Sequence, residues 1–270
     1  MHILRAGYDL DGFFRRLATA RARVLMLDYD GTLAPFHADP ARAAPYPGVI
    51  PLLDEMVAAG HTRMVIVSGR WTRQLTPLLG LRRMPEVWGS HGWERMRPDG
   101  GYDAAHIGTG ARNALAHAEG WIGEIEAMGA RGERKPAGLA FHWRGLDDAR
   151  VRGIRAAVYA RWVEHDLGND LDWHDFDGGI ELRAPGRNKG DVVRMLAAEV
   201  GPGAAIGYFG DDLTDEQAFE AMPADGLSVL VRPRKRPTAA ALWLQPPHEL
   251  LEGLRRWHVV AEAGDAATQD

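Results

Sequence analysis

The sequence predicts an α/β protein with a mostly parallel central sheet and a second, inserted α+β domain. Three observations lead to this prediction. Short apolar segments alternate with helical patterns, which is typical of parallel strands covered by helices on both faces. Acidic or hydroxyl residues come directly after several of these segments, where open α/β sheets bind ligands. Between about residues 108 and 185 the alternation is interrupted by a block of different character.

Five segments are expected to form strands of the central sheet. Each is a nearly continuous apolar run bounded by polar residues or glycine, as in strands buried on both faces. They comprise residues 23–28, 62–68, 86–90, 204–210 and 227–231. Between the first two strands, residues 47–60 place apolar side chains at helical spacing, with Gly60 at the helix end. Residues 71–80 are expected to form a second, shorter helix.

The middle of the chain follows a different order of elements. Asp99-Gly100 is a hairpin signal between two short extended pieces within residues 91–107. We then expect a helix at 111–127, a strand at 138–144, a helix at 148–163, and an antiparallel pair of strands, 171–176 and 179–184, around the turn 177–179. This block is predicted to be a separate α+β domain, and residues 259–270 are expected to fray.

Composition excludes several classes of function. The net charge of −5, with 32 basic and 37 acidic residues, argues against duplex nucleic acid as the main partner. The absence of cysteine excludes disulfides, Cys-type zinc sites and thiol nucleophiles, so a metal would need oxygen or imidazole ligands, which favours Mg²⁺. No run approaches the roughly 18 apolar residues of a membrane span. We expect a soluble, cytoplasmic protein without a membrane partner, and the sequence indicates no oligomeric state.

Two carboxylates follow the first strand, in the segment VLMLDYDGTLAPF (residues 24–36). Asp28 and Asp30 are two residues apart, so in an extended chain both side chains point toward one site at the sheet edge. Gly31 permits a tight turn in which its N–H group and Thr32 can approach an anion. One carboxylate could attack phosphorus while the other handles the proton of the leaving oxygen. The alternative is an Asp-Gly turn with an incidental second acid.

A hydroxyl and a lysine stand at two further element ends. Ser68 ends the second strand and could bind a phosphate oxygen, although a helix N-cap before residue 71 is an equally good interpretation. Lys189, beside Gly190 at the start of a helix, could bind phosphate as a point charge. The alternative for Lys189 is a solvated loop lysine.

Three acids follow the strand at 204–210. Asp211, Asp212 and Asp215 would repel one another at a folded strand end unless a cation lay there. The alternative is a capped helix with Asp212 or Thr214 as the N-cap. Taken together, the strand ends supply a nucleophile, an acid/base group, a hydroxyl, a cation and metal ligands.

These motifs resemble known phosphatase signatures. DYDGTL (28–33), VSGR (67–70), KG (189–190) and GDDLTD (210–215) resemble, in this order, the signatures of haloacid-dehalogenase-like phosphatases. More narrowly, VSGR, GSHGWE (89–94), ERKPAGLAFHWR (133–144), GIELR (179–183) and GDDLTDEQAF (210–219) resemble the trehalose-6-phosphate phosphatase family. The resemblance extends from about residue 20 to about residue 255.

The resemblance implies a fold and a set of roles. The fold is a Rossmann-like parallel-sheet core domain (residues 1–107 and 186–270) with an inserted α+β cap domain (residues 108–185). Asp28 is implied to be the nucleophile and Asp30 the general acid and then base. Mg²⁺ is the implied cofactor, held by Asp28, the main-chain carbonyl of Asp30 and Asp211, with Asp212 and Asp215 as supporting acids. Phosphate would be held by Gly31, Thr32, Ser68, Gly69 and Lys189, the last also a catalytic residue.

The cap would close over the sugar of the substrate. The implied substrate residues are Arg70, His91, Glu133, Lys135, His142, Arg144 and Glu181, because charged groups at fixed positions can hydrogen-bond to sugar hydroxyls. Alternatively, His142 and Arg144 only line the polar face of a strand. Trp143 and Trp173 could stack on a sugar, although strand tryptophans are more often part of a core. Trp93 and the HWR triplet depart from the family pattern, which leaves the identity of the sugar open.

The sequence therefore predicts a phosphatase that hydrolyses trehalose 6-phosphate, a small-molecule substrate. One alternative is a phosphatase of another glycosyl or pseudo-disaccharide phosphate, such as sucrose phosphate, glucosylglycerol phosphate or mannosyl-phosphoglycerate. A non-catalytic sugar-phosphate sensor is a more remote alternative, since no member of the catalytic set is missing. A signalling receiver domain is disfavoured because the pair Asp211-Asp212 comes late in the chain.

Overall fold

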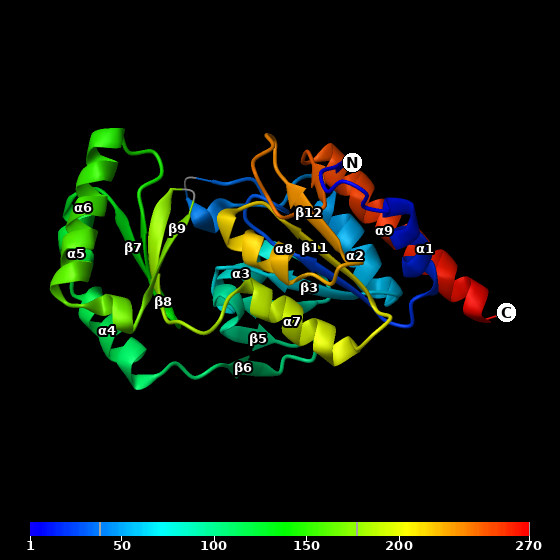
Figure 1. Cartoon of the computed structure of the whole chain (residues 1–270), viewed down its shortest axis with the longest axis horizontal. Helices are drawn as coiled ribbons and strands as arrows, with labels where there is room; N and C mark the ends of the chain where they lie inside the picture. The colour runs from blue at the N-terminus through cyan, green and yellow to red at the C-terminus, as the bar shows by residue number, and fades with distance from the viewer. Residues whose placement is uncertain (38, 177, 270) are drawn as a thin grey trace. The chain divides into compact units, whose positions relative to one another are not determined.

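The computed structural model describes residues 1–37, 39–176 and 178–269. The chain divides into two compact units, residues 1–103 with 188–270, and residues 104–187 (Figure 1). The predicted domain boundaries lie within four residues of these limits. Asp177, in the predicted turn between two strands, lies outside the described residues. Within the described ranges, no helix is both long and apolar enough to cross a membrane.

The first unit is built on a sheet whose central strands are parallel. The strand order within the described residues is β1-β13-β12-β11-β2-β3-β4-β5-β6. The strands are β1 (His2–Ile3), β2 (Arg23–Leu27), β3 (Arg63–Val67), β4 (Glu86–Gly89), β5 (Glu94–Met96), β6 (Tyr102–Ala104), β11 (Ala205–Gly210), β12 (Leu227–Val231) and β13 (Leu242–Leu244). Neighbours from β13 to β4 pair in parallel, whereas β1 and β5 add antiparallel pairs at the two sides. The predicted parallel α/β core is confirmed.

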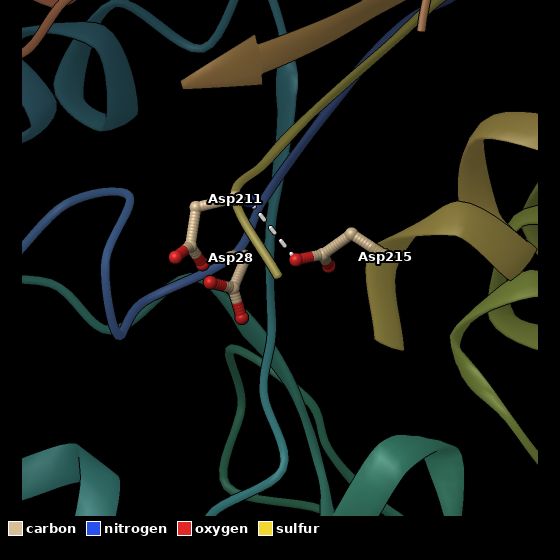
Figure 2. A group of neighbouring side chains, drawn as sticks. All are labelled: Asp28, Asp211 and Asp215. Atoms are coloured by element: carbon tan, nitrogen blue, oxygen red, sulfur yellow. Dashed lines mark hydrogen bonds between the residues drawn. The ribbon is translucent and has the colours of Figure 1, made fainter. Parts of the chain in front are cut away.

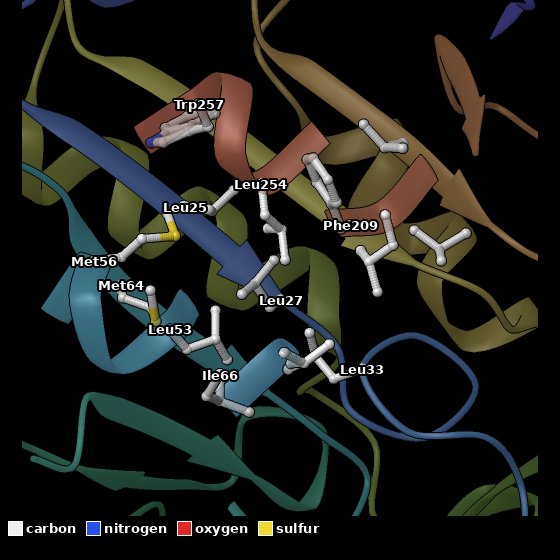
Figure 3. Packing of buried hydrophobic residues seen from close by; sticks show 14 of the residues in the cluster. Leu25, Leu27, Leu33, Leu53, Met56, Met64, Ile66, Phe209, Leu254 and Trp257 are labelled. Atoms are coloured by element: carbon white, nitrogen blue, oxygen red, sulfur yellow. The ribbon is translucent and has the colours of Figure 1, made fainter. Parts of the chain in front are cut away.

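Helices cover both faces of this sheet. They are α1 (Leu10–Thr19), α2 (Val49–Ala59), α3 (Thr72–Leu79), α7 (Lys189–Val200), α8 (Glu216–Ala221) and α9 (His248–Gln269). Leu25 and Leu27 of β2 pack with α1, α2, α3 and α9 residues in one buried cluster, part of which Figure 3 shows. Val24 and Met26 pack on the opposite face with α7 and α8 residues. Because both faces are covered, every residue of β2 is buried, which explains the uninterrupted apolar run from Val24 to Leu27.

The second unit is an antiparallel sheet with helices on one face. The strand order is β7-β8-β10-β9, with β7 (Arg131–Lys135), β8 (Gly138–His142), β9 (Asp172–Phe176) and β10 (Gly179–Arg183). The helices are α4 (Thr109–Glu119), α5 (Ile122–Ala127) and α6 (Asp148–Glu164). The register pairs Glu133 and Glu181 with Ala140, so these residues share one face, while Leu139 and Leu182 lie on the other.

Several predicted elements differ from the observed ones. The single helix expected at 111–127 is two helices, because Gly120, a poor helix former, follows the end of α4. The tail expected to fray from residue 259 continues α9 to Gln269. Strand β7 was not predicted, since its sequence RGERK contains no apolar residue and therefore no alternation. Helix α1, strand β13 and helix α9 were also missed.

Candidate active site

The two acidic motifs meet because β2 and β11 are neighbours. Leu27 pairs with Phe209, and the N–H of Asp28 donates to the Phe209 carbonyl at 2.9 Å. Asp28 and Asp211, the residues that follow these strands, are therefore brought together at the carboxyl edge of the sheet. Gly31 has a φ of +85°, and a Cβ atom there would lie 2.0 Å from Oδ2 of Asp211. Only glycine fits this turn.

Lys189 enters the same cluster from the start of α7. Asn188 caps this helix, accepting from the N–H groups of Gly190 and Asp191. The Lys189 Nζ lies 2.8 Å from Oδ1 of Asp28 and 2.7 Å from Oδ1 of Asp215, and its side chain is 3% exposed. Burial alone would lower the pKa of Lys189, but the two carboxylates outweigh it and raise the pKa. The interpretation as a solvated loop lysine is wrong.

Asp215 organises the loop after β11. Its carboxylate is fully buried and accepts from Tyr208 Oη at 2.6 Å, besides Lys189. It also accepts from the N–H groups of Asp211 at 3.0 Å and Asp212 at 2.9 Å. Asp212 in turn caps the 3₁₀ turn Leu213–Asp215, so the capping interpretation of Asp212 is correct. Sequence reasoning missed Tyr208, whose only signal is a hydroxyl-bearing ring within an otherwise apolar strand.

The cluster has the composition of a hard-cation site. Asp28, Asp211 and Asp215 each offer a carboxylate oxygen, and these oxygens lie within 4.8 Å of one another (Figure 2). Burial, opposed by Lys189 and reinforced by Asp215 and Asp30, raises the pKa of Asp28 to about 7. Burial and the charges of Asp28 and Asp215 raise the pKa of Asp211 well above its usual value.

The hydrogen bonding of one carboxylate oxygen in this cluster indicates whether the site fits a metal ion. Oδ1 of Asp211 is buried and accepts no hydrogen bond from any residue within the described ranges. A buried carboxylate oxygen in this state is costly unless a cation or water binds it. Carboxylate ligands are those that Mg²⁺ prefers. The residues present therefore fit a divalent cation at Asp28 and Asp211.

The Asp30 side of the site is formed with the segment after β3. Arg70 donates to Asp30 through two bonds of 2.6 Å, Nε to Oδ2 and Nη2 to Oδ1. The backbone N–H of Arg70 donates to Ser68 Oγ at 3.1 Å. Ser68 does not cap α3, which begins at Thr72. On the other side, Thr32 Oγ1 donates to Oδ2 of Asp28 at 3.2 Å.

His91 and Trp93 lie in the turn that follows β4. His91 adopts a φ of +57°, and its ring lies so close to Gly69 that a Cβ there would be 2.6 Å from Nε2. Glycine at position 69 thus makes room for His91. Trp93 is buried, and its indole N–H has no partner within the described part of the chain.

The predicted cap residues form a polar cluster on one face of the second sheet. Lys135 Nζ lies 3.2 Å from Oε1 of Glu181, and His142 Nε2 lies 2.7 Å from Oε2 of Glu133. Burial would raise the pKa of Glu133, but the hydrogen bond with His142 and the charges of Lys135 and Arg131 outweigh it and lower the pKa to about 2.

Residues outside this cluster complete the comparison with prediction. The Arg144 side chain lies against Gly178. Trp173 packs edge to face against Tyr159 and Trp162 of α6, on the face away from Glu181, so it is a packing residue. Sequence reasoning missed Arg183, which is buried although its guanidinium has no hydrogen-bond partner among the described residues. Its place in the GIELR motif was the available signal.

Comparison with known sequences decides the family. The sequence model of the trehalose-phosphatase family matches residues 26–246. The chain belongs to the trehalose-phosphatase family. Among its relatives, the trehalose-phosphate phosphatase of Mycobacterium avium is 32% identical over 267 residues, which cover 91% of this chain and 64% of that protein. An uncharacterized glycosyl hydrolase of Mycobacterium tuberculosis is also 32% identical, over 89% of this chain and 18% of that protein.

A solved structure has a similar fold. The C-terminal domain of C. albicans trehalose-6-phosphate phosphatase aligns with a TM-score of 0.74 and 20% identity, covering 97% of this chain and 99% of that one. This likeness confirms the predicted α/β fold. The chain is shorter than both curated relatives named above: it spans 64% of the length of the first and 18% of the length of the second.

Proposed function

We propose that the protein is a magnesium-dependent phosphatase that hydrolyses trehalose 6-phosphate to trehalose and phosphate. The observation that carries this proposal is the buried cluster in which Asp28 and Asp211, at the ends of β2 and β11, meet Lys189 from the start of α7. Membership of the trehalose-phosphatase family supports the choice of substrate, as do relatives named trehalose-phosphate phosphatase.

Asp28 and Asp30 divide the chemistry between them. The Asp28 carboxylate attacks phosphorus, the bond from phosphorus to the sugar oxygen breaks, and an aspartyl-phosphate forms. Asp30 gives its proton to the departing sugar oxygen. In the second half, Asp30 takes a proton from water, the water oxygen attacks phosphorus, and Asp28 is released together with inorganic phosphate. The two bonds from Arg70 hold the Asp30 carboxylate in place between these steps.

The remaining polar groups hold the phosphate. Lys189 Nζ, the hydroxyls of Thr32 and Ser68, and the N–H group of Gly69 are the proposed donors to the phosphate oxygens. The N–H group of Gly31, also predicted from the sequence as a donor, instead donates to the Ala34 carbonyl at 2.7 Å. Because phosphoryl transfer depends mainly on positioning and charge stabilisation, these donors contribute by fixing phosphorus in line with Asp28.

Mg²⁺ would be held by Asp28, Asp211 and the main-chain carbonyl of Asp30, with Asp212 and Asp215 as supporting acids. When bound, it would offset the negative charge that accumulates where an anionic carboxylate approaches an anionic phosphate. The orphaned Oδ1 of Asp211 supports this assignment.

The second unit is proposed to act as the cap that selects the sugar. Its candidate sugar-binding residues are Glu133, Lys135, His142, Arg144 and Glu181, to which Arg70 and His91 of the first unit are added. The paired charges of Lys135 with Glu181 and of Glu133 with His142 fix their polar atoms, which suits them to hydrogen-bond with hydroxyl groups.

Phosphate release across a panel of sugar phosphates, with Mg²⁺ present, tests the proposal. We expect trehalose 6-phosphate to give the highest kcat/KM. Preference of at least about tenfold for another glycosyl phosphate, equivalent to roughly 1.4 kcal/mol in the barrier, would refute the trehalose assignment and retain the phosphatase. No release from any member of the panel would refute both.

A further inference from the structure

A loop rich in arginine follows β12, and the functions proposed above leave it unused. Residues 232–236 have the sequence RPRKR. Arg234 and Lys235 are exposed, whereas Arg232 and Arg236 are partly buried. The side chains of these two arginines reach back to the loop after β11, which holds the acidic motif.

Arg236 binds the backbone of the two residues that begin this motif. Its Nη2 donates to the carbonyl oxygen of Asp211 at 3.0 Å and to that of Asp212 at 2.8 Å, and its Nε donates to the Asp211 carbonyl at 3.3 Å. Nη1 of Arg232 adds a longer bond of 3.4 Å to the Asp211 carbonyl. Arg236 is thus a planar fork that binds both carbonyl groups.

Glu216 holds Arg236 in this position. The Glu216 carboxylate pairs with Nη1 of Arg236 and also accepts from the Ala239 N–H at 2.7 Å and from Thr238 Oγ1 at 3.2 Å. The negative charge of Glu216 offsets the guanidinium charge, so the pair adds little net positive charge beside Asp211. Glu216 also belongs to the motif GDDLTDEQAF, where no role was assigned to it.

The backbone at Asp211 is consequently held from both sides. Asp215 accepts from the N–H groups of Asp211 and Asp212, while Arg236 donates to their carbonyl groups. Because peptide groups are planar, fixing both ends of these units fixes the direction in which the Asp211 side chain leaves the backbone. Partners that orient a metal ligand in this way typically change metal affinity by 10- to 100-fold.

We propose that Arg236, held and neutralised by Glu216, is a positioning residue that sets the affinity of the Asp211 site for a divalent cation. The inference rests on the proposed function only in requiring that Mg²⁺ bind at Asp28 and Asp211. A purely electrostatic role predicts the opposite effect, since removing a positive charge near a cation site would strengthen cation binding.

Because the positioning role and the electrostatic role predict opposite changes in Mg²⁺ affinity, one measurement distinguishes them. The dissociation constant for Mg²⁺ is measured by isothermal titration calorimetry on the purified chain, without substrate. Arg236→Gln is expected to raise it by about 10- to 100-fold. Arg236→Lys, which keeps the charge and loses the fork, is expected to raise it as well, by a smaller factor. Arg234→Gln removes the same charge from an exposed position of the same loop and is expected to change it by less than about twofold.

Enzyme kinetics provide the second readout. In Arg236→Lys, the Mg²⁺ concentration for half-maximal activity should rise by the same factor as the dissociation constant for Mg²⁺. The KM for a small aryl phosphate, measured at saturating Mg²⁺, should stay unchanged. Unchanged or tighter Mg²⁺ binding in folded Arg236→Gln or Arg236→Lys would overturn the positioning role alone. Absence of Mg²⁺ binding by the unmodified protein would overturn this inference together with the proposed metal site.

Discussion

Asp28, the proposed nucleophile, is buried among groups that affect its charge. It is 3% exposed, and its two carboxylate oxygens are contacted by Lys189 and Thr32. Burial raises its pKa to about 7 in spite of the lysine. Additional positive charge at the site, from a cation, would favour the ionised carboxylate, which is the form that the proposed attack on phosphorus requires.

Replacing this carboxylate should abolish turnover. In Asp28→Asn the amide is neither a competent nucleophile nor a good metal ligand, so we expect phosphate release to fall by at least about a thousandfold. Retention of more than a few per cent of the rate would remove Asp28 from this role.

Asp30→Asn is the matched variant for the preceding prediction. It should be severely slow in turnover, because the acid and base are lost. With 4-nitrophenyl phosphate, whose leaving group needs little protonation, it should still release a burst of nitrophenolate in rapid mixing. Asp28→Asn should show no burst, which separates the two roles.

At the scale of elements, the site depends on two strands that lie next to each other although about 180 residues separate them in the sequence. β2 and β11 pair in parallel, and each delivers an acidic residue to the same edge. A cation held between them would cross-link the two strand ends. Metal removal therefore tests whether activity needs a cation between these strand ends.

Activity should vanish in EDTA and return with Mg²⁺. Ca²⁺ should restore it poorly, because this larger ion takes more ligands and can draw the attacking carboxylate into bidentate binding. The measurement is phosphate release in chelated buffer after addition of each ion. Full activity in thoroughly chelated buffer would defeat the metal assignment of Asp211.

The C-terminal helix α9 contributes side chains to the buried core of the first unit. Trp257 is fully buried in the cluster that Figure 3 shows. Its Nε1 donates to Thr62 Oγ1 at 3.0 Å. Trp257→Ala should therefore lower the free energy of unfolding by about 3–5 kcal/mol. Val259→Ala, two residues away and 61% exposed in the original protein, should change it by less than about 0.5 kcal/mol. Urea unfolding followed by circular dichroism compares them, and similar midpoints would contradict the prediction.

The burial of an element determines whether it could be predicted from the sequence. β2, β3 and β11 are buried on both faces, so their apolar runs are continuous and end abruptly at polar residues. β7 is an edge strand made of charged residues and glycine, and nothing in its pattern distinguishes it from a loop. For α9, which was missed, the apolar residues Leu250, Leu254 and Trp257 have helical spacing and are all buried.

The candidate site was predictable to a similar extent. Short motifs at strand ends predicted Asp28, Asp30 and Asp211 as site residues, and a motif at a helix start predicted Lys189. Contacts between distant segments could not be inferred, because hydrogen bonds such as Tyr208 to Asp215 or Arg236 to Asp211 depend on three-dimensional packing. A run of arginines in a loop is more often a solvated surface, and only the structure distinguishes Arg236 from Arg234.

At the scale of the whole molecule, the chain separates into a unit that carries the acidic cluster and a unit that carries a polar sheet face. The insertion between residues 103 and 188 leaves the strands of the first sheet contiguous in space. Under the proposed function, the chemistry resides in the first unit and discrimination between sugars in the second. These two properties should therefore respond to different substitutions.

Lys135→Ala and Glu181→Ala are the variants that test this separation. Each should lower kcat/KM for trehalose 6-phosphate roughly 5- to 150-fold, which corresponds to a rise of about 1–3 kcal/mol in the activation free energy. The reason is that hydrogen bonds to hydroxyls are lost and buried partners remain unpaired. Since Lys135 and Glu181 form an ion pair at 3.2 Å, the double variant should lose less than the sum of the two. A small aryl phosphate, which lacks the sugar, should be hydrolysed at nearly the original rate.

Arg134→Ala provides the control for these variants. Arg134 lies next to Lys135 in strand β7, but its side chain is 59% exposed and pairs with Glu119 of α4. Neighbouring residues of a strand point to opposite faces, so this change removes a similar charge without touching the polar cluster. It should leave kcat/KM for both substrates within about twofold, since isolated surface ion pairs contribute little. If Lys135→Ala and Glu181→Ala slow both substrates equally while Arg134→Ala slows neither, these two residues support folding or closure of the second unit instead of contacting the sugar.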